Sequence, residues 1–114
     1  MNQSYLKTER LRKSQDYKRV AKMGCKYTTP HFVILVQKNT LNKPRLGLTV
    51  SRRVGNAVIR NTLKRHLKEY FRKNKNFLKN NDYLIIARHN SKRLSSRSII
   101  NELSALLKTH RSVF

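Results

Sequence analysis

Residues 57–73 read AVIRNTLKRHLKEYFRK, and this stretch does most to decide the fold. At about 100° per residue, its apolar side chains fall in one arc of a helix. These side chains are Ile59, Leu63, Leu67, Tyr70 and Phe71. Asn56 stands just before the stretch and is a good N-cap residue. The pattern predicts a helix that buries one side against the rest of the protein.

The adjoining arc of this helix is almost purely basic. It carries Arg60, Asn61, Lys64, Arg65, Lys68 and Arg72. Like charges at i,i+4 spacing destabilise a helix by roughly 0.2–0.5 kcal/mol per pair. A run of charged residues is usually just a solvated helix face. The cost of placing these cations side by side is explained, however, if RNA or DNA phosphates bind between them. With Arg52 and Arg53 just upstream, the arc predicts a nucleic-acid-binding surface.

Segments on both sides of the central helix are typical of strands. Residues 31–37 and 45–51 are rich in β-branched and apolar residues, and we expect them to pair as a hairpin. Residues 26–28 form a short additional strand in this interpretation. Residues 82–88 are continuously apolar after Asp82, which is typical of a strand buried on both faces.

Two more helices complete the predicted order. The first begins at the N-cap Ser14 and ends at Gly24, and the last covers about residues 97–110 with an apolar stripe. The order helix, strands, helix, strand, helix predicts an α+β fold, a two-layer α/β sandwich with a small mixed sheet. We expect residues 1–114 to form a single RNA-binding domain, with residues 1–13 as a flexible basic arm.

Charge narrows the class of partner. The chain of 114 residues carries 27 Lys and Arg against 5 Asp and Glu, a formal net charge of +22. Self-repulsion at this charge opposes a compact monomer unless a polyanion neutralises it. The lone Cys25 excludes an intrachain disulfide and is typical of a reducing compartment. Apolar runs far shorter than the ~20 residues of a membrane span predict a soluble, cytoplasmic protein.

A nuclease site within the protein itself is not indicated. The acids Glu9, Asp16, Glu69, Asp82 and Glu102 form no cluster in the sequence, and the four histidines lack metal-ligand spacing. No glycine-rich phosphate loop is present, since the chain has only 3 glycines. We therefore expect no catalytic residue and no metal site in the protein, and we expect Cys25 to be a packing residue.

The segment from Ser51 to Glu69 resembles the signature of the bacterial ribonuclease P protein subunit. Its elements are Arg60-Asn61, Lys64-Arg65 and Lys68-Glu69, although the family more often has Arg where Lys68 stands. The flanking stretches at 10–13, 32–33, 46–51 and 82–88 match the family in order and spacing. The resemblance covers nearly the whole chain.

This resemblance implies an accessory subunit of an RNA-catalysed endoribonuclease. The family's particle removes the 5′ leader from precursor tRNA, with Mg²⁺ held mainly by RNA and substrate. Its partners would be the catalytic RNA and precursor tRNA, with no membrane and no small-molecule substrate. The expected RNA-binding residues are Arg52, Arg53, Arg60, Asn61, Lys64, Arg65 and Lys68.

A cleft for the single-stranded leader is also implied by the resemblance. Tyr17 matches a family aromatic there, whereas Ala21 and Leu35 replace residues that are often aromatic. Arg10 and Lys13 are expected to add charge beside Tyr17 and Leu35. The alternative interpretation of Tyr17 is a core aromatic with its hydroxyl at the rim.

Two other functions fit the composition. A structural RNA-binding protein, such as a small ribosomal protein, would share the charge but has no reason to carry the ordered signature. A DNA-binding regulator needs a partner helix a short turn before the basic helix, where this sequence predicts a strand and Gly55.

Overall fold

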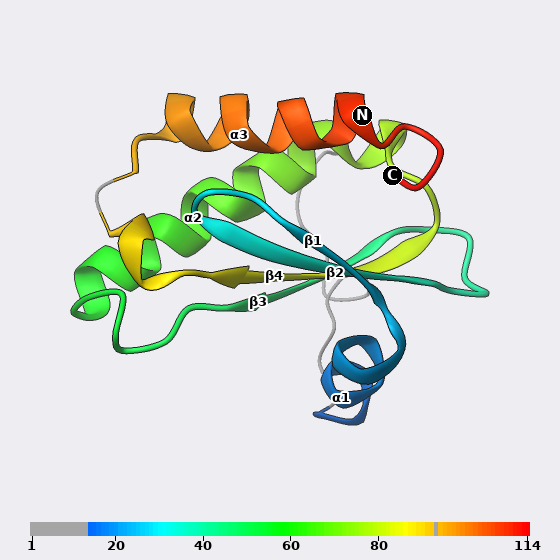
Figure 1. Ribbon diagram of the computed structural model, residues 1–114, viewed down its shortest axis with the longest axis horizontal. Coiled ribbons are helices and arrows are strands. Elements are labelled where there is room, and N and C mark those ends of the chain that lie inside the picture. The colour runs from blue at the N-terminus through cyan, green and yellow to red at the C-terminus, as the bar shows by residue number, and fades with distance from the viewer. Residues whose placement is uncertain (1–13, 93) are drawn as a thin grey trace.

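A four-stranded sheet organises the computed structural model, which describes residues 14–92 and 94–114 (Figure 1). Its strands are β1 (Cys25–Thr28), β2 (Phe32–Lys38), β3 (Arg45–Thr49) and β4 (Asn81–Ala87). They lie in the order β1-β2-β4-β3, with β4 antiparallel to β2 and parallel to β3. The predicted mixed sheet is confirmed, including the short first strand. The prediction that Cys25 is a packing residue is wrong, because Cys25 is exposed at the start of this edge strand.

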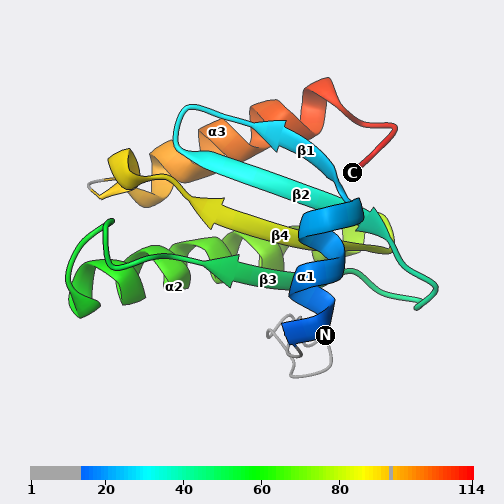
Figure 2. The ribbon, with the colours of Figure 1, turned by 60° about the horizontal axis from the view of Figure 1, so that its bottom comes forward.

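Helices cover the two faces of this sheet unequally. The helices are α1 (Ser14–Met23), α2 (Ala57–Asn74) and α3 (Ser96–Thr109), with short 3-10 turns η2 (Lys75–Phe77) and η3 (His89–Ser91). Both α2 and α3 pack on one face, whereas α1 lies on the other (Figures 1 and 2). The predicted α+β class and element order are confirmed, and α1 adds packing on the second face.

The predicted hairpin between residues 31–37 and 45–51 is wrong. The apolar β4 lies between β2 and β3 and pairs with both. A strand that is apolar on both faces is best placed in the middle of a sheet, where two neighbours pair its backbone and both faces are covered. The loop between β2 and β3 therefore passes the end of β4, and Asn39 donates to Asp82 Oδ1 there at 3.0 Å.

The core consists of two clusters, one on each face of the sheet. The larger cluster joins Phe32, Ile34 and Leu46 of the sheet to Leu67 of α2 and Ile99 of α3. The smaller one joins Val20 of α1 to Leu35 and Leu84. The apolar arc of α2 is confirmed, because Leu63, Leu67, Tyr70 and Phe71 are buried and Ile59 packs against them.

Local sequence explains how the helices begin and end. The Asn56 side chain accepts a hydrogen bond from the Ile59 amide at 3.0 Å, as expected of an N-cap. Gly24 follows α1, and its amide donates to Val20 O at 2.8 Å. A Cβ at position 24 would lie 2.5 Å from that oxygen, so this tight exit toward β1 requires glycine.

None of the helices in the described part of the chain is both long and apolar enough to cross a membrane.

Candidate nucleic-acid interface

The basic face of α2 forms a shallow hollow of about 340 Å³. Its lining comes from successive turns of one helix: Asn61, Lys64, Arg65, Lys68, Glu69 and Arg72. Asn61 and Arg65 are exposed, whereas Lys64 and Lys68 are half-buried. The stems of such side chains lie along the protein while their charged ends stay in solvent. The hollow thus presents four cations and one amide to any ligand that enters it.

Glu69 does not neutralise this hollow as a free acid would. Its carboxylate accepts hydrogen bonds from Arg72, and Lys73 Nζ lies 3.6 Å from it. The hydrogen bond from Arg72 holds the pKa of Glu69 below its usual value. The acid is therefore already paired within the helix, and Lys64, Arg65 and Lys68 remain as the hollow's cations.

Three of the predicted RNA-binding residues lie outside the hollow. Arg52 and Arg53 are exposed in the turn before α2, which is closed by the Val54 amide donating to Ser51 O at 3.1 Å. Arg60 is half-buried, and its Nε has no hydrogen-bond partner among the described residues. The hollow thus brings together Asn61, Lys64, Arg65 and Lys68, and Arg60, one turn before Lys64 on the same helix, is not among its lining residues.

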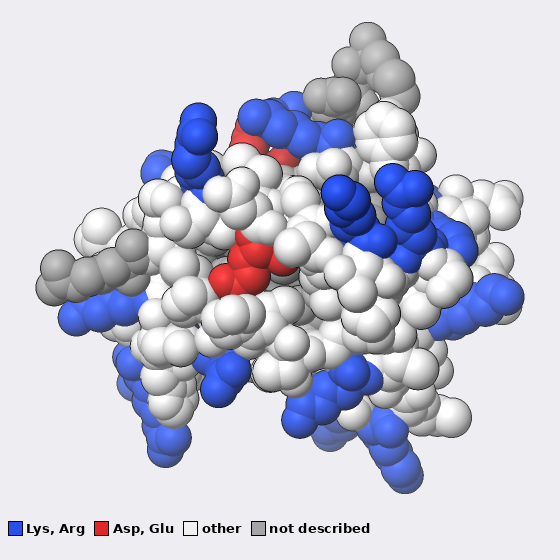
Figure 3. All heavy atoms as spheres, turned by 45° about the horizontal axis from the view of Figure 1, so that its top comes forward, with Lys and Arg blue, Asp and Glu red and all other residues white. Residues whose placement is uncertain are grey.

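Positive charge also surrounds the face of the molecule on which α3 lies. Figure 3 shows Lys and Arg side chains around that face, with acidic atoms confined to small areas. A polyanion could therefore approach the protein from several directions.

The opposite side of the sheet holds the predicted leader-binding residues. Tyr17 is half-buried and packs against the cluster of Val20, Leu35 and Leu84 under α1. Leu35 is only 7% exposed, so it lies in the floor beneath α1 and offers little surface of its own. Ala21 is exposed. Arg10 and Lys13 lie outside the described residues.

An uncovered strip of sheet continues from this cluster. Strand register places Val33, Ile86 and Thr49 side by side on the face that α1 occupies. Val33 and Ile86 are half-buried and Thr49 is exposed, so α1 covers only part of the face. Tyr17 and this strip together form a partly apolar surface, flanked at the end of β4 by the exposed Arg88.

A buried carboxylate holds α1 on the sheet. Asp82 of β4 is 1% exposed and accepts from Arg45 Nε at 2.8 Å, Arg45 Nη2 at 2.7 Å and Arg19 Nη2 of α1 at 3.0 Å. Asp16 of α1 lies 3.7 Å from Arg45. Burial raises the pKa of Asp82, but the hydrogen bonds from Arg45, Asn39 and Arg19 outweigh it and lower the pKa.

A second carboxylate fastens α3 to the turn before β2. Glu102 accepts hydrogen bonds from the Thr29 hydroxyl and from the His31 amide, the latter at 2.9 Å, and His31 Nδ1 lies 2.7 Å from Glu102 Oε1. Burial raises the pKa of Glu102, but these hydrogen bonds together lower it. Residues 14–92 and 94–114 contain no group of three His, Cys, Asp or Glu side chains that could hold a metal ion.

Sequence reasoning missed both carboxylate anchors. Asp82 and Arg19 are 63 residues apart, and Glu102 and His31 are 71 apart. No local pattern marks such pairs. The only signal was the rarity of acids in a very basic chain, which suggests that each remaining acid has a structural partner.

Comparisons with known proteins agree with this geometry. The sequence model of the family Ribonuclease P matches residues 6–111. The ribonuclease P protein component of Syntrophus aciditrophicus is 42% identical over 102 residues, which cover 89% of this chain and 86% of the relative.

Two solved structures share the fold. One is a Staphylococcus aureus RNase P protein mutant with defective mRNA degradation activity, with a TM-score of 0.87, 35% identity and coverage of 95% of this chain and 92% of that one. The other is the RNase P protein from Thermotoga maritima, with a TM-score of 0.80, 36% identity and coverage of 89% and 96%. The match extends along nearly the whole chain, so the protein belongs to the bacterial ribonuclease P protein family.

Proposed function

We propose that this protein binds the catalytic RNA of ribonuclease P and the 5′ leader of precursor tRNA, and so promotes the endonucleolytic 5′ maturation of tRNA. The observation that carries the proposal is the hollow on α2, where Asn61, Lys64, Arg65 and Lys68 form one cationic surface on a rigid helix. Phosphate contacts of this kind supply affinity and position an RNA without reading its sequence.

The two faces of the sheet suit two RNA segments. The hollow on α2 has cations and an amide for a structured RNA backbone, which fits the catalytic RNA. The surface around Tyr17 and the strip of Val33 and Ile86 is partly apolar, which fits unstacked bases of a single strand. On this proposal the leader lies against α1 and the sheet, opposite α2.

The protein is an accessory subunit on this proposal, and the RNA performs the hydrolysis. Mg²⁺ prefers oxygen ligands, but the described carboxylates already face cationic or hydrogen-bonding groups: Asp82 meets Arg45, Glu69 meets Arg72 and Glu102 meets His31. Phosphates of the RNA and substrate are therefore the proposed Mg²⁺ ligands. The assembled particle would work in the cytoplasm, where precursor tRNA is found.

The decisive experiment is cleavage of precursor tRNA by the cognate catalytic RNA with and without this protein. At limiting Mg²⁺, the protein should raise the cleavage rate and leave the cleavage position unchanged. If the protein had no effect on the rate or on substrate affinity, the proposal would fail. A purely structural RNA-binding protein would bind RNA in this assay without stimulating cleavage.

A further inference from the structure

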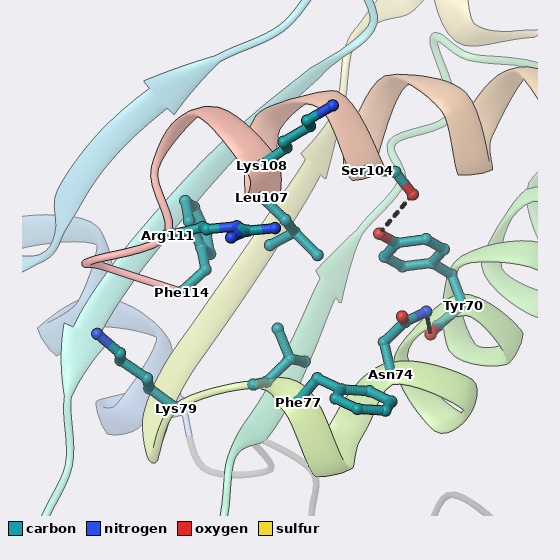
Figure 4. A pocket seen from close by; sticks show the side chains of 10 residues that line it. Tyr70, Asn74, Phe77, Lys79, Ser104, Leu107, Lys108, Arg111 and Phe114 are labelled. Carbon is teal, nitrogen blue, oxygen red and sulfur yellow. Dashed lines mark hydrogen bonds between the residues drawn. The ribbon is translucent and has the colours of Figure 1, made fainter.

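A second pocket lies on the α2 and α3 side of the molecule and shares no lining residue with the hollow (Figure 4). It occupies about 360 Å³ between the C-terminal halves of α2 and α3 and the last residues of the chain. Leu107 and Phe114 supply apolar walls, and Phe77 of η2 stands at its edge. None of the predicted RNA-binding residues lines it.

Phe77 is the most unusual feature of this pocket. Its side chain is 84% exposed and belongs to neither core cluster. An exposed aromatic ring at the edge of a pocket offers a flat surface on which a second ring can stack. Phe77 therefore has no role in folding that the structure shows, but it suits a planar ligand.

Polar groups of α2 and α3 also line the pocket, with Asn74 lying beside Phe77 (Figure 4). The Tyr70 hydroxyl lies 3.0 Å from Ser104 Oγ, and Asn74 Nδ2 donates to Tyr70 O at 2.9 Å (Figure 4). This bond orients the amide so that Asn74 Oδ1 faces the pocket and can accept a hydrogen bond from a ligand. The pocket thus combines a ring for stacking, Phe77, with groups that can donate hydrogen bonds to the edge of a planar ligand or accept them from it.

The charges around the pocket select an anionic occupant. Lys79, Lys108 and Arg111 line it, and no acidic side chain is among the described lining residues. Lys79 Nζ is held by Ser112 O at 2.6 Å, whereas the Arg111 guanidinium extends across the pocket (Figure 4). A second copy of this chain would bring a further charge of +22 to the pocket, so a protein dimer is the less favourable occupant.

We propose that this pocket binds one unpaired nucleotide of the catalytic RNA, with its base on Phe77 and its phosphate at Arg111. The inference rests on the proposed function. The catalytic RNA is favoured over the leader because the pocket and the Tyr17 surface lie on opposite faces of the sheet (Figures 1 and 2). In contrast, Tyr70 and Asn74 of the pocket belong to α2, the same helix that carries the hollow proposed to bind the catalytic RNA.

The test measures the affinity of full-length variants for the cognate catalytic RNA without substrate. Phe77→Ala should weaken binding roughly 5- to 150-fold, which is the range for one lost base stack. Phe77→Tyr keeps the ring and should restore affinity. Met23→Ala is the matched control, because Met23 is a large, 69% exposed apolar side chain on α1. Arg111→Ala should reduce the log–log salt slope by about 0.7.

Each outcome has a distinct meaning. If Phe77→Ala bound like Met23→Ala while Arg65→Ala weakened binding, the pocket assignment would be wrong and the proposed function would stand. If Phe77→Ala weakened only precursor tRNA, in proportion to leader length, the leader would be the occupant and the catalytic-RNA assignment would be overturned. Loss of a concentration-dependent dimer in Phe77→Ala, with unchanged RNA affinity, would instead identify a protein interface. Failure of wild-type protein to bind the RNA would overturn both proposals.

Discussion

Tyr17 is half-buried against the small core beneath α1, so part of its ring remains accessible to a leader base. A ring that stacks on a leader base contributes about 1–3 kcal/mol. Tyr17→Ala should therefore weaken precursor tRNA binding by the assembled particle by about this amount and leave mature tRNA binding unchanged. Affinities for substrates with leaders of graded length provide the measurement.

Tyr17→Phe is the matched control for this prediction, since it keeps the ring and removes only the hydroxyl. It should bind long leaders nearly as well as wild type. Equal weakening of all substrates by Tyr17→Ala, the leaderless one included, would assign Tyr17 to the core. Circular dichroism and thermal unfolding of both variants show whether α1 stays in place.

On the other face of the sheet, substitution of Arg65 tests whether the α2 hollow binds the catalytic RNA. It is exposed in the α2 hollow, so its removal should cost phosphate contacts without disturbing the core. Arg65→Ala should lower affinity for the catalytic RNA several-fold and reduce the magnitude of the log–log salt slope by about 0.7–0.9. Lys38→Ala removes one exposed charge at the end of β2 and should change affinity less. Equal effects of the two variants would show that net charge, and not the hollow, governs binding.

The attachment of α1 to the sheet depends on the Asp82 cluster. The pKa of Asp82 is lowered in the folded protein, so below pH 5 the unfolded chain binds more protons. This contribution to stability is complete above the unfolded pKa of about 3.9 and is lost as pH falls through the folded pKa. Glu102 contributes in the same direction. We expect the free energy of unfolding to fall between about pH 5 and pH 2.

The variant Asp82→Asn isolates the contribution of this cluster. It leaves Arg45 and Arg19 without their buried carboxylate and should lower stability at pH 7 by about 3 kcal/mol. Its stability should then depend less on pH below 5 than that of wild type. Denaturant unfolding across this pH range is the measurement, and parallel pH profiles for the two proteins would contradict the assignment.

The individual helices and strands were easier to predict from the sequence than which strands pair with each other. The 3.6-residue period of 57–73 and the N-cap Asn56 are local signals, and the helix they predicted is α2, Ala57–Asn74. The pairing of β2 with β4 depends on residues about fifty positions apart, as with Val33 and Ile86. No turn motif could show that β4 would separate β2 from β3. The hollow was predictable because one helix supplies it, whereas the pocket at Phe77 requires α3 and the chain end as well.

At the scale of the whole molecule, salt should act in opposite directions on folding and on RNA binding. A net charge of +22 destabilises the free protein by self-repulsion, and screening relieves it. The midpoint of thermal unfolding of the free protein should therefore rise between 50 and roughly 300 mM salt, since the Debye length shortens to less than about 10 Å. Over the same range, affinity for the catalytic RNA should fall steeply.

Both halves of this prediction are measured on the same preparation. Calorimetry gives the midpoint, and equilibrium titration of labelled RNA gives the salt slope. A midpoint that fell with salt would show that the ion pairs of Asp16, Asp82 and Glu102 outweigh the overall repulsion. A flat salt response in binding would contradict the phosphate-contact model.

The central position of β4 also constrains when the chain can fold during synthesis. Until residue 87 has left the ribosome, β2 has a partner only in β1, and β3 has no strand beside it. Phe32, Ile34 and Leu46 pair with β4 residues that are synthesised 37 to 55 positions later, so their apolar side chains cannot be covered by the complete sheet before then. A nascent chain of 80 residues should consequently show no protected amides, and cooperative protection should appear only once β4 and α3 have emerged. The complete sheet can therefore assemble only after β4 has been synthesised.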